Sequence, residues 1–214
     1  MKVNVCPSCL KEGFESYCTK CSKKLFNGKK IRPILNFTRP EFNKAKIDSK
    51  GRLSISGIQI KHSLRIEKNE LVLTEKNGQY ILKPIPSGQF QNLDAVPAIE
   101  HLTMQIASQV YNLKAAENCI IFFANNEIAY LTKRFDVTKN GEKLLQEDFA
   151  QIAERTEETH GKNYKYDFSY EEIGELIKKF VSAYRIEIEK YYKAVLFNYL
   201  FSNGDSHLKN FSLF

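Results

Sequence analysis

The stretch N-G-D-S-H-L-K-N-F-S at residues 203–212 places an acid, an imidazole, an ammonium and an amide just behind the apolar run A-V-L-F-N-Y-L-F. Phosphoryl transfer needs few protein groups: an acid that orients the attacking hydroxyl, a cation against the developing charge and an oxygen ligand for Mg²⁺. We expect Asp205, Lys209 and Asn210 to supply these groups in that order, because the Asp-x₄-Asn spacing matches the protein-kinase catalytic loop. His207 is expected to be a structural hydrogen-bonding residue rather than a base. The alternative interpretation of the whole stretch is an exposed polar turn after a helix.

Segments further upstream carry the other groups that such a site needs. Lys83 stands at the end of the predicted strand Y-I-L-K-P and can pair with nucleotide phosphates as a point charge. Glu100 opens the next predicted helix and can hold that lysine, although an acid favoured by the helix dipole is the alternative. Gly57, in L-S-I-S-G-I-Q-I-K, can approach a phosphate through its backbone. The strand Y-L-T-K-R-F-D at 130–136 runs into a turn where backbone groups can meet an adenine.

The order of the predicted elements indicates the fold class. Apolar and polar residues alternate from 51 to about 83, with Lys-Asn and Asn-Gly turns between the runs, which predicts an antiparallel sheet. Helical spacing predicts a helix over 98–115, and Asn125-Asn126 joins two strands of a hairpin. Helical periodicity dominates the C-terminal half. We therefore expect an α+β, kinase-like fold of two lobes, with a β-rich nucleotide-binding N-lobe over 51–136 and a helical C-lobe over 137–214.

The N-terminal cysteines predict a metal site. Four of the five cysteines form two C-x-x-C pairs, Cys6 with Cys9 and Cys18 with Cys21. Each pair can turn two thiolates toward one ion, and two pairs complete a tetrahedral zinc site with no open position for catalysis. We expect a structural four-cysteine zinc ribbon over residues 1–25, with free thiols or a labile disulfide pair as the alternatives. Cys119 is expected to be a buried core thiol.

Composition bounds the remaining possibilities. The chain has 214 residues, of which 43% are hydrophobic, and this is enough for a core. Its net charge of +7 suits an anionic partner such as a nucleotide, a nucleic acid or an acidic protein, although lysines that simply solvate the surface are the alternative. No apolar run approaches the roughly 20 residues of a membrane span, and the N-terminus lacks a secretory core, so we expect a cytoplasmic protein. Residues 26–50, rich in Lys, Asn and Pro, are expected to be a linker.

These motifs together resemble the HipA-type serine/threonine kinases of bacterial toxin–antitoxin systems. The matching segments come in the order of that family and lie within residues 51–214. They are S-I-S-G-I-Q-I-K at 54–61, Y-I-L-K-P at 80–84, I-E-H-L-T-M at 99–104, K-R-F-D at 133–136, Q-E-D-F-A-Q at 146–151 and N-G-D-S-H-L-K-N-F-S at 203–212.

The resemblance implies ATP as the cofactor and a place for each of its parts. Lys83 would contact the phosphates, and Asp136 would reach the ribose. The hinge around the adenine would be formed by Lys133, Arg134 and Phe135. The resemblance also places Q-E-D at 146–148 near the groove for the protein substrate.

The resemblance further implies catalytic roles and a self-regulating modification. Asp205 would be the catalytic acid and Asn210 a Mg²⁺ ligand. The family autophosphorylates a serine in its glycine-containing loop; Ser54 matches that position, and Ser56 is a second candidate. Phosphorylation there would add about −1.5 to −2 charge beside the phosphate-binding backbone. We expect this charge to expel the loop from the site and to switch the enzyme off.

Two departures from the family pattern shape the expected partners. The Cys-rich segment and linker replace the usual N-terminal subdomain, so we expect an antitoxin or a separate subdomain chain as partner, with DNA reached only through the antitoxin. The sequence ends at Phe214, before a second Mg²⁺-binding acid, and S-L-F would be the strand leading toward it. This predicts a fragment or a natural truncation that associates with itself or with another chain. The resemblance implies a translation-linked protein, such as an aminoacyl-tRNA synthetase, as the substrate.

Two other functions stay open at this point. The first is an inactive pseudokinase or antitoxin-like subunit that binds a nucleotide or a partner protein without transferring phosphate. The second is a nucleic-acid-binding zinc protein, which the positive charge and the cysteine pairs allow. A recognition helix or interleaved aromatic and basic residues would support it, and the sequence shows neither.

Overall fold

The computed structural model describes residues 4–48, 60–89, 91–138 and 142–214. The chain divides into two compact units, Met1–Lys143 and Leu144–Phe214, hereafter unit 1 and unit 2. Each unit has its own apolar core. The sequence placed this boundary after Asp136, whereas the structure places it after Lys143.

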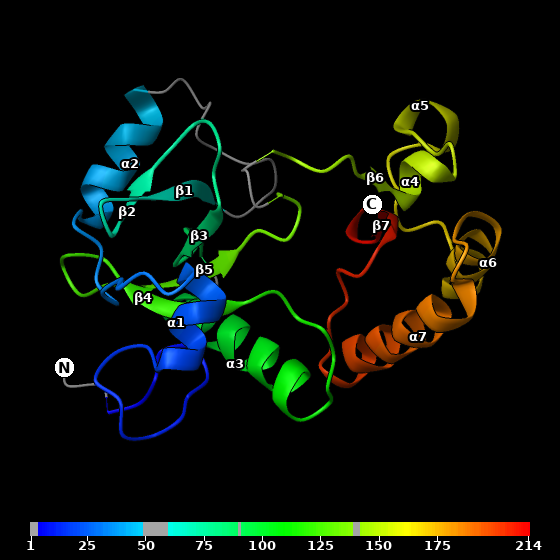
Figure 1. The fold of residues 1–214 in the computed structure, drawn as a ribbon. Helices are drawn as coiled ribbons and strands as arrows, with labels where there is room; N and C mark the ends of the chain where they lie inside the picture. Colours follow the sequence, from blue (N-terminus) through cyan, green and yellow to red (C-terminus); the bar gives the residue numbers. More distant parts are fainter. Residues whose placement is uncertain (1–3, 49–59, 90, 139–141) are drawn as a thin grey trace. The chain divides into compact units, whose positions relative to one another are not determined.

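Unit 1 is built on a five-stranded antiparallel sheet of order β2-β1-β3-β5-β4 (Figure 1). The strands are β1 (His62–Glu67), β2 (Glu70–Leu73), β3 (Tyr80–Pro84), β4 (Asn118–Phe122) and β5 (Ile128–Lys133). Lys68 and Asn69 join β1 to β2 with φ of 45° and 65°, as a tight hairpin turn requires. Asn126, with φ of 64°, lies in the turn between β4 and β5. The antiparallel sheet is confirmed from β1 onward, and so are the turns predicted at Lys68-Asn69 and Asn125-Asn126, whereas residues 51–59 lie outside the described residues.

Alternation along the strands gives the sheet two different faces. Tyr80, Leu82 and Leu131 point into the core of unit 1, which α1 (Thr19–Phe26) and α2 (Arg39–Asp48) complete. The opposite face carries Lys83 and its cross-strand neighbour Tyr130. There α3 (Val96–Gln109), preceded by the 3-10 turn η1 (Leu93–Ala95), packs against β4 and β5. The period of two therefore separates an apolar face from the face that bears the lysine.

The expected linker over 26–50 needs correcting for the part that the structure describes. Leu35 and Phe42 are buried in the core of unit 1, at 3% and 0% exposure. The backbone of the same segment bonds the outer edge of β4, because Phe122 donates its N–H to Pro33 O and accepts from Leu35 N, at 2.9 and 2.7 Å. Only isolated side chains of this segment reach the core, so the sequence shows no period that would reveal its packing.

Phe42→Ala should lower the free energy of unfolding by about 3–5 kcal/mol, because truncating a buried Phe removes its transfer energy and leaves a cavity. The ring of Phe42 contacts those of Phe37, His62 and Phe123. Urea denaturation measures the change. Ile99→Ala, at a position on α3 that is 59% exposed, is the control and should change stability by no more than about 0.5 kcal/mol. A loss below about 1 kcal/mol for Phe42→Ala would show that α2 is not part of the core.

The described part of unit 2 consists of helices and one two-stranded ribbon. Its elements are β6 (Glu147–Asp148), α4 (Phe149–Ile152), α5 (Glu157–His160), α6 (Tyr170–Phe180), α7 (Tyr184–Leu200), the 3-10 turn η2 (Leu208–Asn210) and β7 (Ser212–Leu213). Its core holds Phe149, Ala150, Ile173, Ile177 and Leu208. The predicted helical character is confirmed, although α4 is a single turn. Asp148 caps its start, and Glu154, with φ of 54°, breaks the helix after it.

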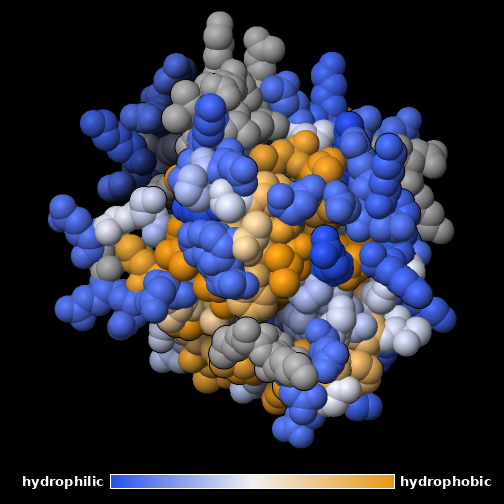
Figure 2. Space-filling model, turned by 90° about the vertical axis from the view of Figure 1, so that its left-hand side faces the viewer, coloured by the Kyte–Doolittle hydropathy of each residue, from blue (hydrophilic) through white to orange (hydrophobic). Residues whose placement is uncertain are grey.

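Hydrophilic side chains surround a band of apolar residues on the face drawn in Figure 2. Helix length is a separate matter from this surface pattern: the longest helix that the structure describes is α7, with 17 residues. Within the described ranges, no helix has the length and apolar character needed to cross a bilayer.

Candidate functional site

The structure brings together Lys83 and Glu100, the predicted phosphate lysine and its predicted partner. Lys83 Nζ donates to Glu100 Oε1 across the α3-facing side of the sheet. The two side chains are 24% and 27% exposed, so the pair is shielded but open to a ligand. The same Nζ lies 5.5 Å from the ring centroid of Tyr130. Glu100 lies in the second turn of α3, where the lysine rather than the helix dipole is its main partner.

A second cation, Lys61, belongs to the same cluster and was missed from the sequence. Burial lowers the pKa of Lys61, and the neighbouring ammonium of Lys83 lowers it further, while Glu100 opposes both effects. The charges of Lys61 and Lys83 thus act on each other near one carboxylate, and a positive environment of this kind favours an anion. The signal was present in I-Q-I-K, but a lysine in an alternating strand looks the same as a solvated one.

In the segment 133–136, the side chain of Lys133 contacts α1. Lys133 Nζ donates to Lys24 O and to Asn27 Oδ1, at 2.7 and 3.0 Å, so its side chain caps the C-terminal end of α1. Burial lowers the pKa of Lys133. The hinge was predicted through backbone groups, so this side-chain contact leaves the assignment of Lys133 a prediction. Phe135 is 66% exposed. Its contact with the adenine, and that of the backbone of the segment, stays a prediction.

Arg134 and Asp136 form a two-pronged ion pair. Arg134 Nε donates to Asp136 Oδ1 at 2.8 Å, and its Nη2 donates to Oδ2 at 2.5 Å. This pair lowers the pKa of Asp136, against the effect of burial. Asp136 would have to share its oxygens with Arg134 in order to meet a ribose. Ser54, Ser56 and Gly57 lie outside the described residues, so the loop that they form stays a prediction.

In unit 2, the loop after α7 presents Asp205 with its side chain 75% exposed. Tyr166 Oη donates to Asp205 Oδ1 at 3.1 Å, and His207 Nε2 lies 3.6 Å from the same oxygen. Burial, followed by the nearby Lys165, lowers the pKa of His207, so the imidazole is neutral at pH 7. Asn210 Nδ2 donates to the backbone oxygen of Asp205 and closes the loop. The amide oxygen of Asn210 is then the part of that side chain that can serve a cation.

The strand after this loop pairs with the Q-E-D segment within unit 2. Asp148 lies opposite Ser212 in the β6–β7 ribbon, and Gln146 Nε2 donates to Ser212 Oγ at 2.8 Å. Lys209 and Asp148 line a shallow groove of about 440 Å³. Two motifs that lie far apart in the sequence thus meet around the exposed Lys209. The strand predicted for S-L-F is confirmed as β7 (Ser212–Leu213).

The four cysteines of the two pairs form a cluster in unit 1. The sulfur atoms of Cys6, Cys9, Cys18 and Cys21 lie within 4.8 Å of one another. Cys9 and Cys18 are 3.9 Å apart, close to the edge of about 3.8 Å in a tetrahedron with Zn–S bonds of about 2.3 Å. Backbone N–H groups of Cys18 and Cys21 donate to the sulfurs of Cys6 and Cys18, at 3.3 and 3.5 Å. The donor set and its spacing fit a zinc ion.

The pKa shifts of the cysteine thiols in this cluster also favour the binding of a metal ion. A hydrogen bond from Cys21 is the largest cause that lowers the pKa of Cys6, to about 4, whereas the same bond raises the pKa of Cys21. One thiolate is thus stabilised by the protons of its neighbours, and a dication could replace those protons. Cys119 is fully buried, as predicted, and burial raises its pKa to about 12.

Comparison with known proteins identifies the family. The sequence profile described as HipA-like C-terminal domain matches residues 53–214. The chain belongs to this family. A Haemophilus influenzae protein named "Putative kinase" is 29% identical over 208 residues, which are 94% of this chain but only 59% of that protein.

The HipA-like fold is also seen in a solved structure. A chain of the Shewanella oneidensis toxin–antitoxin complex of HipA, HipB and operator DNA matches with a TM-score of 0.55 and 22% identity. The match covers 81% of this chain and 45% of that chain, so this chain spans about half the length of the relatives that it matches. The mixed α+β architecture with an antiparallel sheet is therefore shared, and the two-lobed kinase arrangement stays a prediction.

The pair of Arg134 and Asp136 makes a prediction about pH. Because the pKa of Asp136 is lowered from 3.8 in the folded state, its stabilisation is present above pH 3.8 and is lost as the pH falls through the folded value. Asp136→Asn should lose about 1–3 kcal/mol of unfolding free energy at pH 7. Urea denaturation at pH 7, 5 and 3 should show this difference from the unmodified chain shrinking only at pH 3. The exposed Asp94→Asn is the control, and an Asp136→Asn loss that stays equal at all three pH values would contradict the ion pair.

Proposed function

We propose that this chain carries the nucleotide-binding and phosphoryl-transfer groups of a HipA-like serine/threonine protein kinase. The observation that carries the proposal is the pair of Lys83 and Glu100, with Lys61 beside it, on one face of the sheet. An ammonium held by a carboxylate on the neighbouring helix is the arrangement that positions nucleotide phosphates in protein kinases. Membership of the HipA-like family supports the same assignment.

The loop after α7 supports the chemical step. Asp205 is exposed, and Tyr166 fixes one of its oxygens, so the other oxygen can accept the proton of a substrate hydroxyl. Asn210 offers an amide oxygen, a ligand type that Mg²⁺ accepts. Lys209 would face the charge that develops on the transferred phosphoryl group. Mg²⁺, when bound with ATP, would neutralise phosphate charge.

Membership of the family also leads us to propose how the chain is regulated and which partners it has. Transfer to Ser54 or Ser56 would place a phosphate in the chain's own glycine-containing loop and switch it off. The solved relative is a complex with HipB and operator DNA, so we propose an antitoxin-like partner, with DNA contacted through that partner. A translation-linked protein such as an aminoacyl-tRNA synthetase is the proposed substrate class.

The first experiment combines nucleotide binding with the intact mass of the chain after incubation with Mg-ATP. We expect a gain of one phosphate on Ser54 or Ser56. Lys83→Ala should weaken binding of a fluorescent ATP analogue about 10- to 100-fold, because a bond to a charged group is worth about 1.5–3 kcal/mol. Asp205→Asn should bind the analogue normally and gain no phosphate.

Lys76→Ala, at an exposed position in the turn between β2 and β3, is the matched control and should behave like the unmodified chain. If Lys83→Ala bound the analogue as tightly as Lys76→Ala does, the nucleotide site would be wrongly placed. Binding without any mass gain would instead favour an inactive, nucleotide-binding subunit.

We further propose that the cysteine cluster holds one structural zinc ion. Purified chain should contain about one zinc per molecule, by the tetrahedral stoichiometry of four thiolates. Cys9→Ser should lose the zinc and unfold at a lower temperature, measured by mass spectrometry of metal content and by calorimetry. Cys119→Ser is the control: a hydroxyl in the core costs about 1–3 kcal/mol but should leave the zinc content unchanged. Full zinc content in Cys9→Ser would contradict the site.

A further inference from the structure

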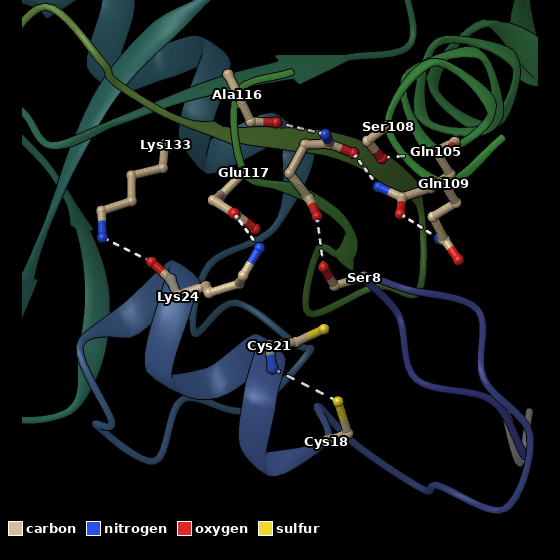
Figure 3. A network of polar contacts seen from close by, with 11 residues as sticks. Ser8, Cys18, Cys21, Lys24, Gln105, Ser108, Gln109, Ala116, Glu117 and Lys133 are labelled. Atoms are coloured by element: carbon tan, nitrogen blue, oxygen red, sulfur yellow. Dashed lines mark hydrogen bonds and ion pairs between the residues drawn. The ribbon is translucent and has the colours of Figure 1, made fainter. Parts of the chain in front are cut away.

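The turn between Cys6 and Cys9 is bonded to β4 and α3, and Figure 3 shows the bond that Ser8 of this turn makes and the network of Gln105 and Gln109 on α3. Ser8 Oγ donates to Asn118 O at 2.8 Å, and Pro7 O accepts from Ile120 N at 2.9 Å. Asn118 and Ile120, the two partners of this turn, both belong to β4. On the other side, Gln109 Nε2 of α3 donates to Cys9 O at 3.1 Å. A single C-x-x-C turn thus supplies two sulfurs to the cluster and three hydrogen bonds to β4 and α3.

Asn118 continues this connection into α3. Its side chain oxygen accepts from Gln105 Nε2 at 2.9 Å and lies 2.7 Å from His101 Nδ1, while its Nδ2 donates to Ala116 O at 2.6 Å. The residue is only 2% exposed, so these bonds are made without competition from water. Because His101 directly follows Glu100 in α3, the connection runs from the cysteine turn to the partner of the nucleotide lysine.

The second cysteine pair is held on the sheet through α1. The sulfur of Cys18 caps the first turn of this helix. At the other end, Tyr80 Oη donates to Leu25 O at 2.8 Å, and Lys24 Nζ pairs with Glu117 at 2.8 Å. Both cysteine pairs are therefore fastened next to the start of β4.

Apart from these hydrogen bonds, the cysteine turns have few apolar contacts to keep them folded. The apolar cluster of this segment consists of the four cysteines and Phe14. A segment without a core of its own takes its folding energy from the metal. Loss of the ion would free the turn that carries Ser8, and with it the bond to Asn118.

We propose that metal binding at the four cysteines fixes α3 against β4 through Ser8 and Asn118, and so holds Glu100 against Lys83. Ser8 and Asn118 act as positioning residues in this scheme. The link between the metal and α3 stands on the contacts alone, and only its effect on ATP rests on the proposed function.

Hydrogen exchange of the zinc-loaded full chain, read by mass spectrometry, tests the link. Ser8→Ala keeps all four cysteines but loses the bond to Asn118. It should retain one zinc per chain, while amides of α3 exchange about 3- to 10-fold faster and the ATP analogue binds about 3- to 10-fold more weakly, as the loss of one hydrogen bond predicts. Chelation of the zinc should accelerate exchange in α3 by at least as much. Ser22→Ala is the matched control, since its hydroxyl donates to Lys29 O, away from β4.

The outcomes are distinct. Equal α3 exchange in Ser8→Ala and Ser22→Ala, at equal zinc content, would overturn the proposal, as would α3 exchange that does not respond to chelation. Faster α3 exchange with no analogue binding in any form of the chain would support the link and reject the proposed nucleotide function instead. Loss of zinc from Ser8→Ala would also count against the proposed link between the metal and α3, because the hydroxyl of Ser8 would then stabilise the cysteine cluster rather than α3.

Discussion

The ion pair between Lys83 and Glu100 is the constraint on which the arrangement of unit 1 depends. A partly shielded pair is worth forming only if both partners are held, because long side chains lose rotamer freedom when they are fixed. The pleat of β3 points Lys83 away from the apolar core, and the packing of α3 on β4 and β5 presents Glu100 to it. Neither element could shift by one residue without separating the two charges, since a slip in β3 would turn the lysine into the core.

The need to hold both partners of this ion pair also accounts for the many residues that pack along the outer edge of β4. An exposed edge strand has unpaired N–H and C=O groups and a backbone that is free to move. Here residues 7–8 and 33–35 supply partners along that edge, and α1 and α2 close the core behind it. The N-terminal segment is thus part of the sheet's support. Because α3 packs on β4, holding β4 in place also holds α3 in place. The contacts at the outer edge of β4 therefore support the ion pair between Lys83 and Glu100.

The sequence predicted those features that are encoded by short-range pattern. Alternation and turn residues such as Lys68 and Asn69 located the strands, and the motif around Asp205 located the loop after α7. Features that depend on distant partners left no pattern to detect. The side chain of Lys133 contacts α1, more than 100 residues earlier, and no local pattern indicated that contact. Lys61 was overlooked for the same reason, because its meaning comes from Lys83 and Glu100 in space.

In unit 2, the environment of His207 bears on the role proposed for Asp205. A charged imidazolium at 3.6 Å would compensate the carboxylate and compete with any substrate proton. Burial of the ring and the positive charge of Lys165 disfavour that charged form, so the ring faces Asp205 as a neutral group. Tyr166 then contributes a neutral hydrogen bond that orients the carboxylate without neutralising it. Under the proposed function, a proton acceptor at this position needs an oriented carboxylate whose charge is left uncompensated, and a neutral His207 beside Asp205 meets that need.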